Sequence, residues 1–158
     1  MASGGQFLPL LDDDDMTQQQ PDNRDKIKEL ALSMREMPQA NLPTTHHFAD
    51  GMYCRSLFRS SGTLIVGKVH KKEHFYIVCF GCVDVTSGGE VKRYKSGDII
   101  VSKPGTQRAV LAVEDSLCIT VHRTNNTDLD EIERELIEPC DYALFDASNN
   151  HKAIEVKE

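Results

Sequence analysis

Two glycine-bounded segments in the middle of the chain constrain its fold more than any other feature. Residues 67–81 have the sequence GKVHKKEHFYIVCFG, and residues 97–108 have the sequence GDIIVSKPGTQR. Each joins an alternating apolar and polar stretch to a glycine turn, which is typical of short β-strands connected by tight turns. Similar short stretches continue from residue 44 to residue 124. A series of short strands at this spacing predicts an all-β sandwich or barrel.

The elements on either side of this barrel are predicted from periodicity. Ile27, Leu30, Ala31, Met34 and Met37 recur at helical spacing, which predicts a helix within residues 22–38. A second helix is expected over 127–138, capped by Thr127 or Asp128, with Leu129, Ile132 and Leu136 on one face. Residues 1–21 are expected to be a disordered acidic tail, and 139–158 a polar tail.

Within the barrel the longest predicted strand is residues 75–85, with Gly81 inside it. Residues 87–89, Ser-Gly-Gly, are a hairpin turn signal. Further strands are expected over 63–70, 91–94, 98–101, 109–113 and 117–121.

Composition limits the partners that the protein can have. The chain has 158 residues and a net charge of −7, so it suits one domain with an acidic surface that disfavours nucleic acid. No run of residues is long and apolar enough to predict a membrane span. The five cysteines follow no disulfide framework, which favours free thiols and a cytoplasmic location. Residues 60–110 carry eight basic and four acidic side chains, and this local excess favours a small anionic ligand.

The candidate binding residues follow from strand alternation. Side chains two apart share a face of a strand, so Lys68 and His70 are expected together, and His74 with Tyr76 on the next strand. Val78 and Phe80 would continue that second face and line the floor of a pocket.

The spacing of these residues resembles the two motifs of the cupin superfamily over roughly residues 45–123. In the first motif, counting back from Gly81, Lys68 and His70 take the two histidine positions and His74 takes the glutamate position. In the second motif, counting on from Gly97, Lys103 takes the proline position and Arg108 the final histidine position. The resemblance implies a cupin-type double-stranded β-helix, a jelly-roll barrel that commonly forms homo-oligomers.

Three chemistries remain open for the pocket. Lysine and arginine offer no lone pair at neutral pH, so Lys68 and Arg108 favour a carboxylate or phosphate over a metal dication. A divalent transition metal held by His70, His74 and His122 is the second possibility. In the third, the histidines are polar residues at a barrel rim without a ligand.

Two further resemblances bear on function. Arg108-Ala109 is similar to the arginine and alanine that follow the phosphate-binding turn of cyclic-nucleotide-binding jelly rolls, where the arginine holds the cyclic phosphate. The run from Thr44 to the helix at Asp128 also looks like small cupin-like proteins of tailed phages, which would imply a role in the virion or in the host cytoplasm.

The sequence therefore predicts a non-catalytic cupin-fold protein that binds a small anion such as a nucleotide, a sugar phosphate or a carboxylate. The expected ligand-binding residues are Lys68, His70, His74, Tyr76, Lys103 and Arg108. No cofactor is expected in this case. The alternatives are a metal-dependent enzyme of dioxygenase or isomerase type that uses His70, His74 and His122, and a structural or virion oligomer that binds nothing.

Overall fold

The computed structural model describes residues 21–87 and 89–148. The predicted acidic tail, apart from residue 21, lies outside the described residues, as do residues 149–158 of the predicted polar tail. Among the described residues, no helix has the length and apolar character needed to cross a membrane.

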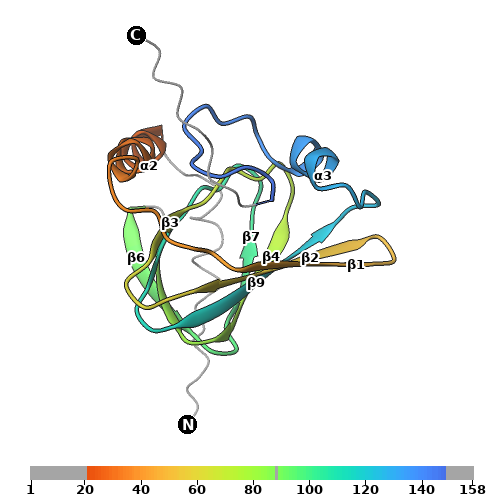
Figure 1. Ribbon diagram of the computed structural model, residues 1–158, viewed down its shortest axis with the longest axis horizontal. Coiled ribbons are helices and arrows are strands. Elements are labelled where there is room, and N and C mark those ends of the chain that lie inside the picture. The colour runs from red at the N-terminus through yellow and green to blue at the C-terminus, as the bar shows by residue number, and fades with distance from the viewer. Residues whose placement is uncertain (1–20, 88, 149–158) are drawn as a thin grey trace.

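Two antiparallel sheets form the body of the protein (Figure 1). The five-stranded sheet has the order β1-β2-β9-β4-β7, and the four-stranded sheet has the order β3-β8-β5-β6. The first contains β1 (Thr44–Ala49), β2 (Met52–Arg59), β9 (Ser116–Arg123), β4 (His74–Phe80) and β7 (Ile99–Ser102). The second contains β3 (Leu64–Val66), β8 (Ala109–Ala112), β5 (Cys82–Ser87) and β6 (Glu90–Lys95).

The strand order identifies the fold as a jelly roll. The chain pairs β2 with β9, β3 with β8, β4 with β7 and β5 with β6, so the strands β2 to β9 form a long hairpin wound into two sheets. Within each arm of this hairpin, β2 to β5 and β6 to β9, successive strands alternate between the sheets, which is the eight-stranded double-stranded β-helix. The predicted cupin-type barrel with an N-terminal and a C-terminal helix is therefore confirmed.

The prediction of one long strand over 75–85 is wrong, because the chain changes sheets at Gly81. Gly81 has a φ of 95°, and a Cβ there would lie 2.2 Å from Oγ of Ser116 and 2.4 Å from the carbonyl oxygen of Asp115. Only glycine fits such a backbone crossing. The register of β4 against β9 also shifts between Val78 and Phe80.

The bulge at the end of β4 corrects the predicted pocket floor. Phe80 lies on the outer surface with 46% of its area exposed, so it does not line the pocket. Val78 does point inward, where it packs with Val83, Val85 and Cys118 in the core of the barrel.

The two predicted helices are present. Helix α2 (Pro21–Met34) packs Ile27 and Ala31 inward, but it ends before Met37, which is exposed. It contacts β3 of the four-stranded sheet. Proline is favoured in the first turn of a helix because that turn needs no backbone donor, and Pro21 begins α2.

Helix α3 (Leu129–Leu136) is capped as predicted, since the Asp128 carboxylate accepts a hydrogen bond from the backbone N–H of Glu131 at 3.0 Å. Its buried residues Ile132 and Leu136 pack against Tyr53 of β2.

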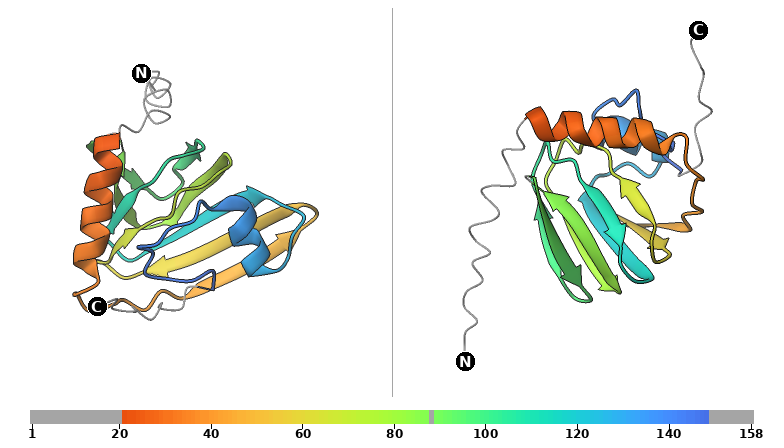
Figure 2. Two further views of the ribbon diagram at one scale, coloured as in Figure 1. Left: turned by 90° about the horizontal axis from the view of Figure 1, so that it is seen from above. Right: turned by 90° about the vertical axis from the view of Figure 1, so that its left-hand side faces the viewer.

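Helix α3 and the segment that follows it cover the same end of the barrel as α2 (Figures 1 and 2). Backbone bonds attach this cover. His70 and Ile137 form an isolated β-bridge, Lys71 donates to the carbonyl of Leu136, and Glu138 donates to the carbonyl of Val69. This cover closes the end of the barrel that contains the cavity.

Candidate metal centre and cavity

A cavity of about 190 Å³ lies inside the barrel below α3. It exceeds the roughly 150 Å³ of an engineered cavity that takes up benzene, so it has room for a small organic molecule. Its walls come from β2, β3, β4, β8 and β9, from both helices, and from segments outside the sheets that include residues 67–70 and 140–147.

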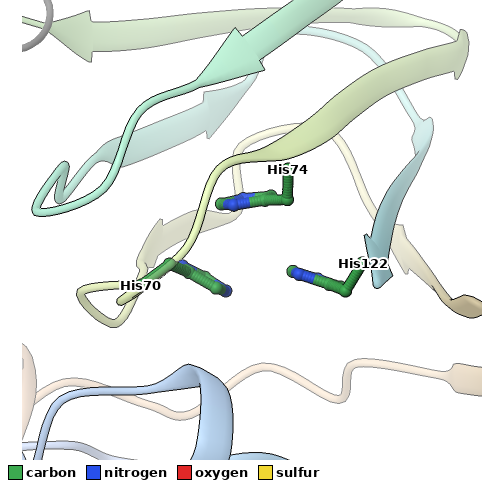
Figure 3. Close-up of side chains that lie close together, drawn as sticks. All are labelled: His70, His74 and His122. Atoms are coloured by element: carbon green, nitrogen blue, oxygen red, sulfur yellow. The ribbon is translucent and has the colours of Figure 1, made fainter. Parts of the chain in front are cut away.

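Three histidines converge at the covered end of this cavity (Figure 3). His74 begins β4, His122 lies near the end of β9, and His70 lies in the segment that leads into β4. Their candidate ligand nitrogens all lie within 4.8 Å of one another. The ring centroids are separated by 4.2 Å for His70 and His74, 4.6 Å for His74 and His122, and 5.2 Å for His70 and His122.

Strand pairing explains why these rings meet. Phe75 pairs with Val121 in the β4–β9 ladder, which places His74 and His122 side by side on the inward face of that ladder. The bridge between His70 and Ile137 holds His70 opposite them. The stacking of Tyr53, the cross-strand partner of His122, supports the third ring at a centroid distance of 5.8 Å.

Hydrogen bonds orient the three imidazoles. Nδ1 of His74 lies 3.2 Å from the carbonyl oxygen of Lys72, and donation to that oxygen leaves Nε2 with its lone pair for a metal. Nε2 of His122 lies 3.0 Å from the hydroxyl of Thr120. The backbone of Lys68 bonds His70 in the same way as Lys72 bonds His74. At metal sites, a hydrogen bond to the ring nitrogen that does not bind the metal fixes the orientation of the imidazole.

Burial keeps the histidines neutral. Desolvation is the largest cause that lowers the pKa of each ring, well below its ordinary value for His70 and to about 3 for His122. The neighbouring histidines and Arg55 lower the pKa of His70 and His122 further, and Arg108 lowers that of His74. Neutral imidazole is the protonation state that binds a metal. The donor set thus fits a divalent transition metal.

Arginines surround the histidines within the cavity. Arg108 is buried and donates from Nη1 to the hydroxyl of Ser102 on β7. Arg55 lines the cavity from β2, in register with Thr120. Arg59, also on β2, donates from Nη1 to the hydroxyl of Tyr76 at 3.1 Å. The cavity side of the site is therefore strongly cationic.

The predicted ligand-binding residues are brought together with one exception. The cavity is lined by Lys68, His70, His74, Tyr76 and Arg108, and by His122 of the predicted metal set. Lys103 does not line it, because its ammonium pairs with Glu73 at 3.1 Å. Lys68 is paired as well, with Glu133 of α3.

Several cavity residues carry no signal in the sequence. Glu133 belongs to a helix whose face was predicted only from its apolar residues. The segment around Tyr142 has no periodicity, yet Tyr142 hydrogen-bonds Gln107 and lines the cavity. Arg59 is different, because alternation along its strand puts Tyr53, Arg55 and Arg59 on one face and so leaves a position in the pocket open to it.

Comparison with known proteins finds distant similarity to solved structures. No family model and no curated protein sequence matches the chain. Among solved structures, it is similar to an RmlC-like cupin from Shewanella frigidimarina NCIMB 400, with 16% identity, a TM-score of 0.49, and coverage of 57% of this chain and 82% of that one.

Two other solved structures give similar values. KdgF from Halomonas sp. shares 19% identity and a TM-score of 0.49, over 58% of this chain and 87% of that one. A protein with a double-stranded β-helix domain from Klebsiella pneumoniae subsp. pneumoniae MGH 78578 shares 17% identity and a TM-score of 0.49, over 62% and 90%. At these values the fold assignment rests on the strand order of the chain itself.

Proposed function

We propose that this protein is a metal-binding cupin-fold protein in which His70, His74 and His122 hold a divalent transition metal and the cavity binds a small organic anion beside it. The observation that carries the proposal is the convergence of three imidazoles, two buried and one half-buried, with candidate ligand nitrogens within 4.8 Å of one another in the wall of a cavity. Bound there, the metal would supply Lewis-acid polarisation of a ligand oxygen.

The ion pair of Lys68 with Glu133 supports a metal at this position. An uncompensated lysine at the first histidine position of the motif would repel a dication. In this structure the carboxylate of Glu133 offsets that charge. This answers the objection that Lys68 raises, whereas Arg108 keeps its charge near His74.

The charge of the cavity supports an anionic ligand. Its lining contains four cationic side chains, Arg55, Arg59, Lys68 and Arg108. It contains two acidic ones, Glu133 and Asp146. With neutral histidines the excess of positive charge is two before any metal is added, and an organic anion would balance it.

A metal-dependent enzyme is the second candidate. The observation that favours it is the number of protein ligands, since sites with three protein ligands leave positions open for a water or a substrate. The chain's own contribution would be to exclude water with α3 and to orient an anion with the arginines.

Metal analysis of the purified protein tests the proposal. We expect about one transition metal per chain by inductively coupled plasma mass spectrometry, or uptake of one Co²⁺ after removal of metal with a chelator. His122→Ala should weaken Co²⁺ binding about tenfold or more. His47→Ala, which removes an exposed histidine on β1, is the matched control and should bind as the wild type does. Substoichiometric uptake that His122→Ala leaves unchanged would contradict the proposal.

The outer face of the five-stranded sheet supports the expected homo-oligomer. Ile77 pairs with Ile119 and Ile99, and Phe75 pairs with Val121, so apolar side chains form continuous rows on the outside of this sheet. A sheet face exposed to water normally carries polar side chains. A second copy of the chain is proposed to cover this face, because a continuous apolar sheet face can pair with the same face of another copy.

A further inference from the structure

The buried arginine at the end of β2 is the feature that the metal site does not explain. Arg59 is 3% exposed and lines the cavity. Its Nη1 donates to the hydroxyl of Tyr76, while its Nε is buried and has no hydrogen-bond partner among the described residues. Within residues 21–87 and 89–148, no acidic side chain forms an ion pair with it at 4 Å or less.

The surroundings of Arg59 do not neutralise it. Its guanidinium is charged at any pH the fold tolerates. Burial raises the pKa of Tyr76 far above its ordinary value, so this phenol stays neutral beside it. The charge of Arg59 lowers the pKa of Arg55, which also lines the cavity, while Glu133 raises it. Two guanidinium groups that repel each other in a desolvated place are costly unless an anion joins them.

The position of Arg59 relative to the histidines follows from the strands. Tyr76 lies two residues beyond His74 on β4, on the same inward face, and pairs with Thr120, which lies two residues before His122 on β9. Two residues along a strand span about 7 Å. The Arg59–Tyr76 pair therefore forms the next layer of the cavity below the three histidines.

The free edge of Arg59 indicates which anion fits. With Nη1 engaged by Tyr76, the edge formed by Nε and Nη2 remains, and this side-on edge binds both oxygens of a carboxylate at once. The Tyr76 hydroxyl accepts from Nη1 and is also hydrogen-bonded to the side chain of Cys118, so Tyr76 orients the guanidinium while Arg59 supplies the donors for the ligand.

From this geometry we propose that Arg59 and Tyr76 form a carboxylate-binding subsite at the floor of the cavity, and that the ligand is a short organic acid with its carboxylate on Arg59. The other end of the acid, an oxygen or nitrogen, faces His70, His74 and His122. The part that concerns the histidines rests on the proposed metal site, whereas the subsite itself does not.

Thermal shift and calorimetry on the full chain, after chelator treatment, test the subsite without metal. We expect acetate and succinate to raise the melting temperature, and neutral acetamide to leave it unchanged. Arg59→Met should weaken acetate binding at least about tenfold, because a charge-assisted bidentate contact is lost. Tyr76→Phe should weaken it to a smaller extent.

The stability of the ligand-free variants separates this subsite from a structural role. Removing an uncompensated buried charge while keeping the length of the side chain should leave the melting temperature of ligand-free Arg59→Met equal to that of the wild type or above it. Arg123→Met, an exposed arginine on β9, is the matched control and should bind acetate as the wild type does.

Three results would overturn the proposal. They are acetate binding unchanged in Arg59→Met, a lower melting temperature of that variant with no carboxylate effect on the wild type, and stabilisation by inorganic phosphate but by no carboxylate. Metal content of Arg59→Met, measured in parallel, keeps the two proposals distinct. A failure of the metal site appears as loss of Co²⁺ uptake in the wild type, and a failure of the subsite appears only in the anion titrations.

Discussion

Lys68 forms an ion pair with Glu133 across the mouth of the cavity, joining the segment before β4 to helix α3. Both side chains are largely covered, with 20% and 29% of their areas exposed. The free-energy cost of breaking this pair is therefore expected to be larger than for an exposed ion pair and smaller than for a fully buried one. It attaches α3 to the barrel and offsets the charge of Lys68 near the histidines.

Glu133→Gln should therefore destabilise the protein by about 1–2 kcal/mol, because it leaves Lys68 partly buried without its counter-charge. Urea denaturation followed by circular dichroism measures this. The control is Glu131→Gln, which breaks the exposed pair with Arg134 and should cost about 0.5 kcal/mol or less. Equal losses in the two variants would show that Lys68 needs no partner.

The buried histidines predict a loss of stability in mild acid. Because the folded pKa of His122 is about 3, the unfolded chain binds a proton below pH 6.5 that the folded chain does not. Stability is then complete above pH 6.5 and falls as the pH drops toward 3. Between pH 7 and pH 5, metal-free wild type should lose about 2 kcal/mol more than His122→Asn.

Urea titrations at several pH values give both curves. The carboxylates with lowered pKa, Asp84 and Glu135, titrate below this window and do not distort it. Parallel curves for the two proteins between pH 7 and pH 5 would mean that His122 is protonated in the folded state.

Gly81→Ala should be strongly destabilising, by about 3 kcal/mol or more, since it adds a methyl group against Ser116 and Asp115 in a backbone conformation that alanine avoids. Gly97→Ala separates the steric clash from the unfavourable φ. Its φ of 92° is similar, but a Cβ there meets nothing within 4 Å. Gly97→Ala should cost only about 1 kcal/mol. Melting temperatures of the two variants, measured side by side, test whether the crossing itself is the constraint.

The proposed homo-oligomer through the five-stranded sheet predicts that Ile99→Asp gives a monomer, because the change buries a carboxylate in an apolar interface. Ile99 is 61% exposed in the single chain, and Val91 on β6 of the other sheet is 65% exposed. Val91→Asp is therefore the matched control and should keep the oligomer. Size-exclusion chromatography with light scattering reports the mass, and a monomeric wild type contradicts the interface.

The sequence predicted the parts of the site that follow strand spacing. His70 and His74 stand at motif positions, and alternation along β9 directs His122 inward, so all three reach one cavity. The role of Gly81 could not be predicted from its position in the sequence. We expected it inside one strand, whereas it separates β4 from β5. A positive φ and a crossing with Ser116 depend on contacts between distant segments, which periodicity does not encode.

The cover of the cavity was the part that the sequence could not predict. Residues 139–148 are aperiodic, and their position depends on backbone bonds and on single contacts such as that of Tyr142 with Gln107. The ion pair of Glu133 with Lys68 likewise joins residues 65 positions apart. From its charge we expected Lys68 to bind a ligand. In the structure it lies beside α3 and forms an ion pair with Glu133.

The bridge between His70 and Ile137 gives the barrel mouth a mechanical property. One of the three histidines shares its backbone pairing with the end of α3, so a shift of the helix end is expected to shift this residue. Displacing the helix misaligns the ring, and holding the ring immobilises the helix. Occupancy of the histidine cluster would thus be transmitted to the outer surface of the protein as protection of the amides of α3 from hydrogen exchange.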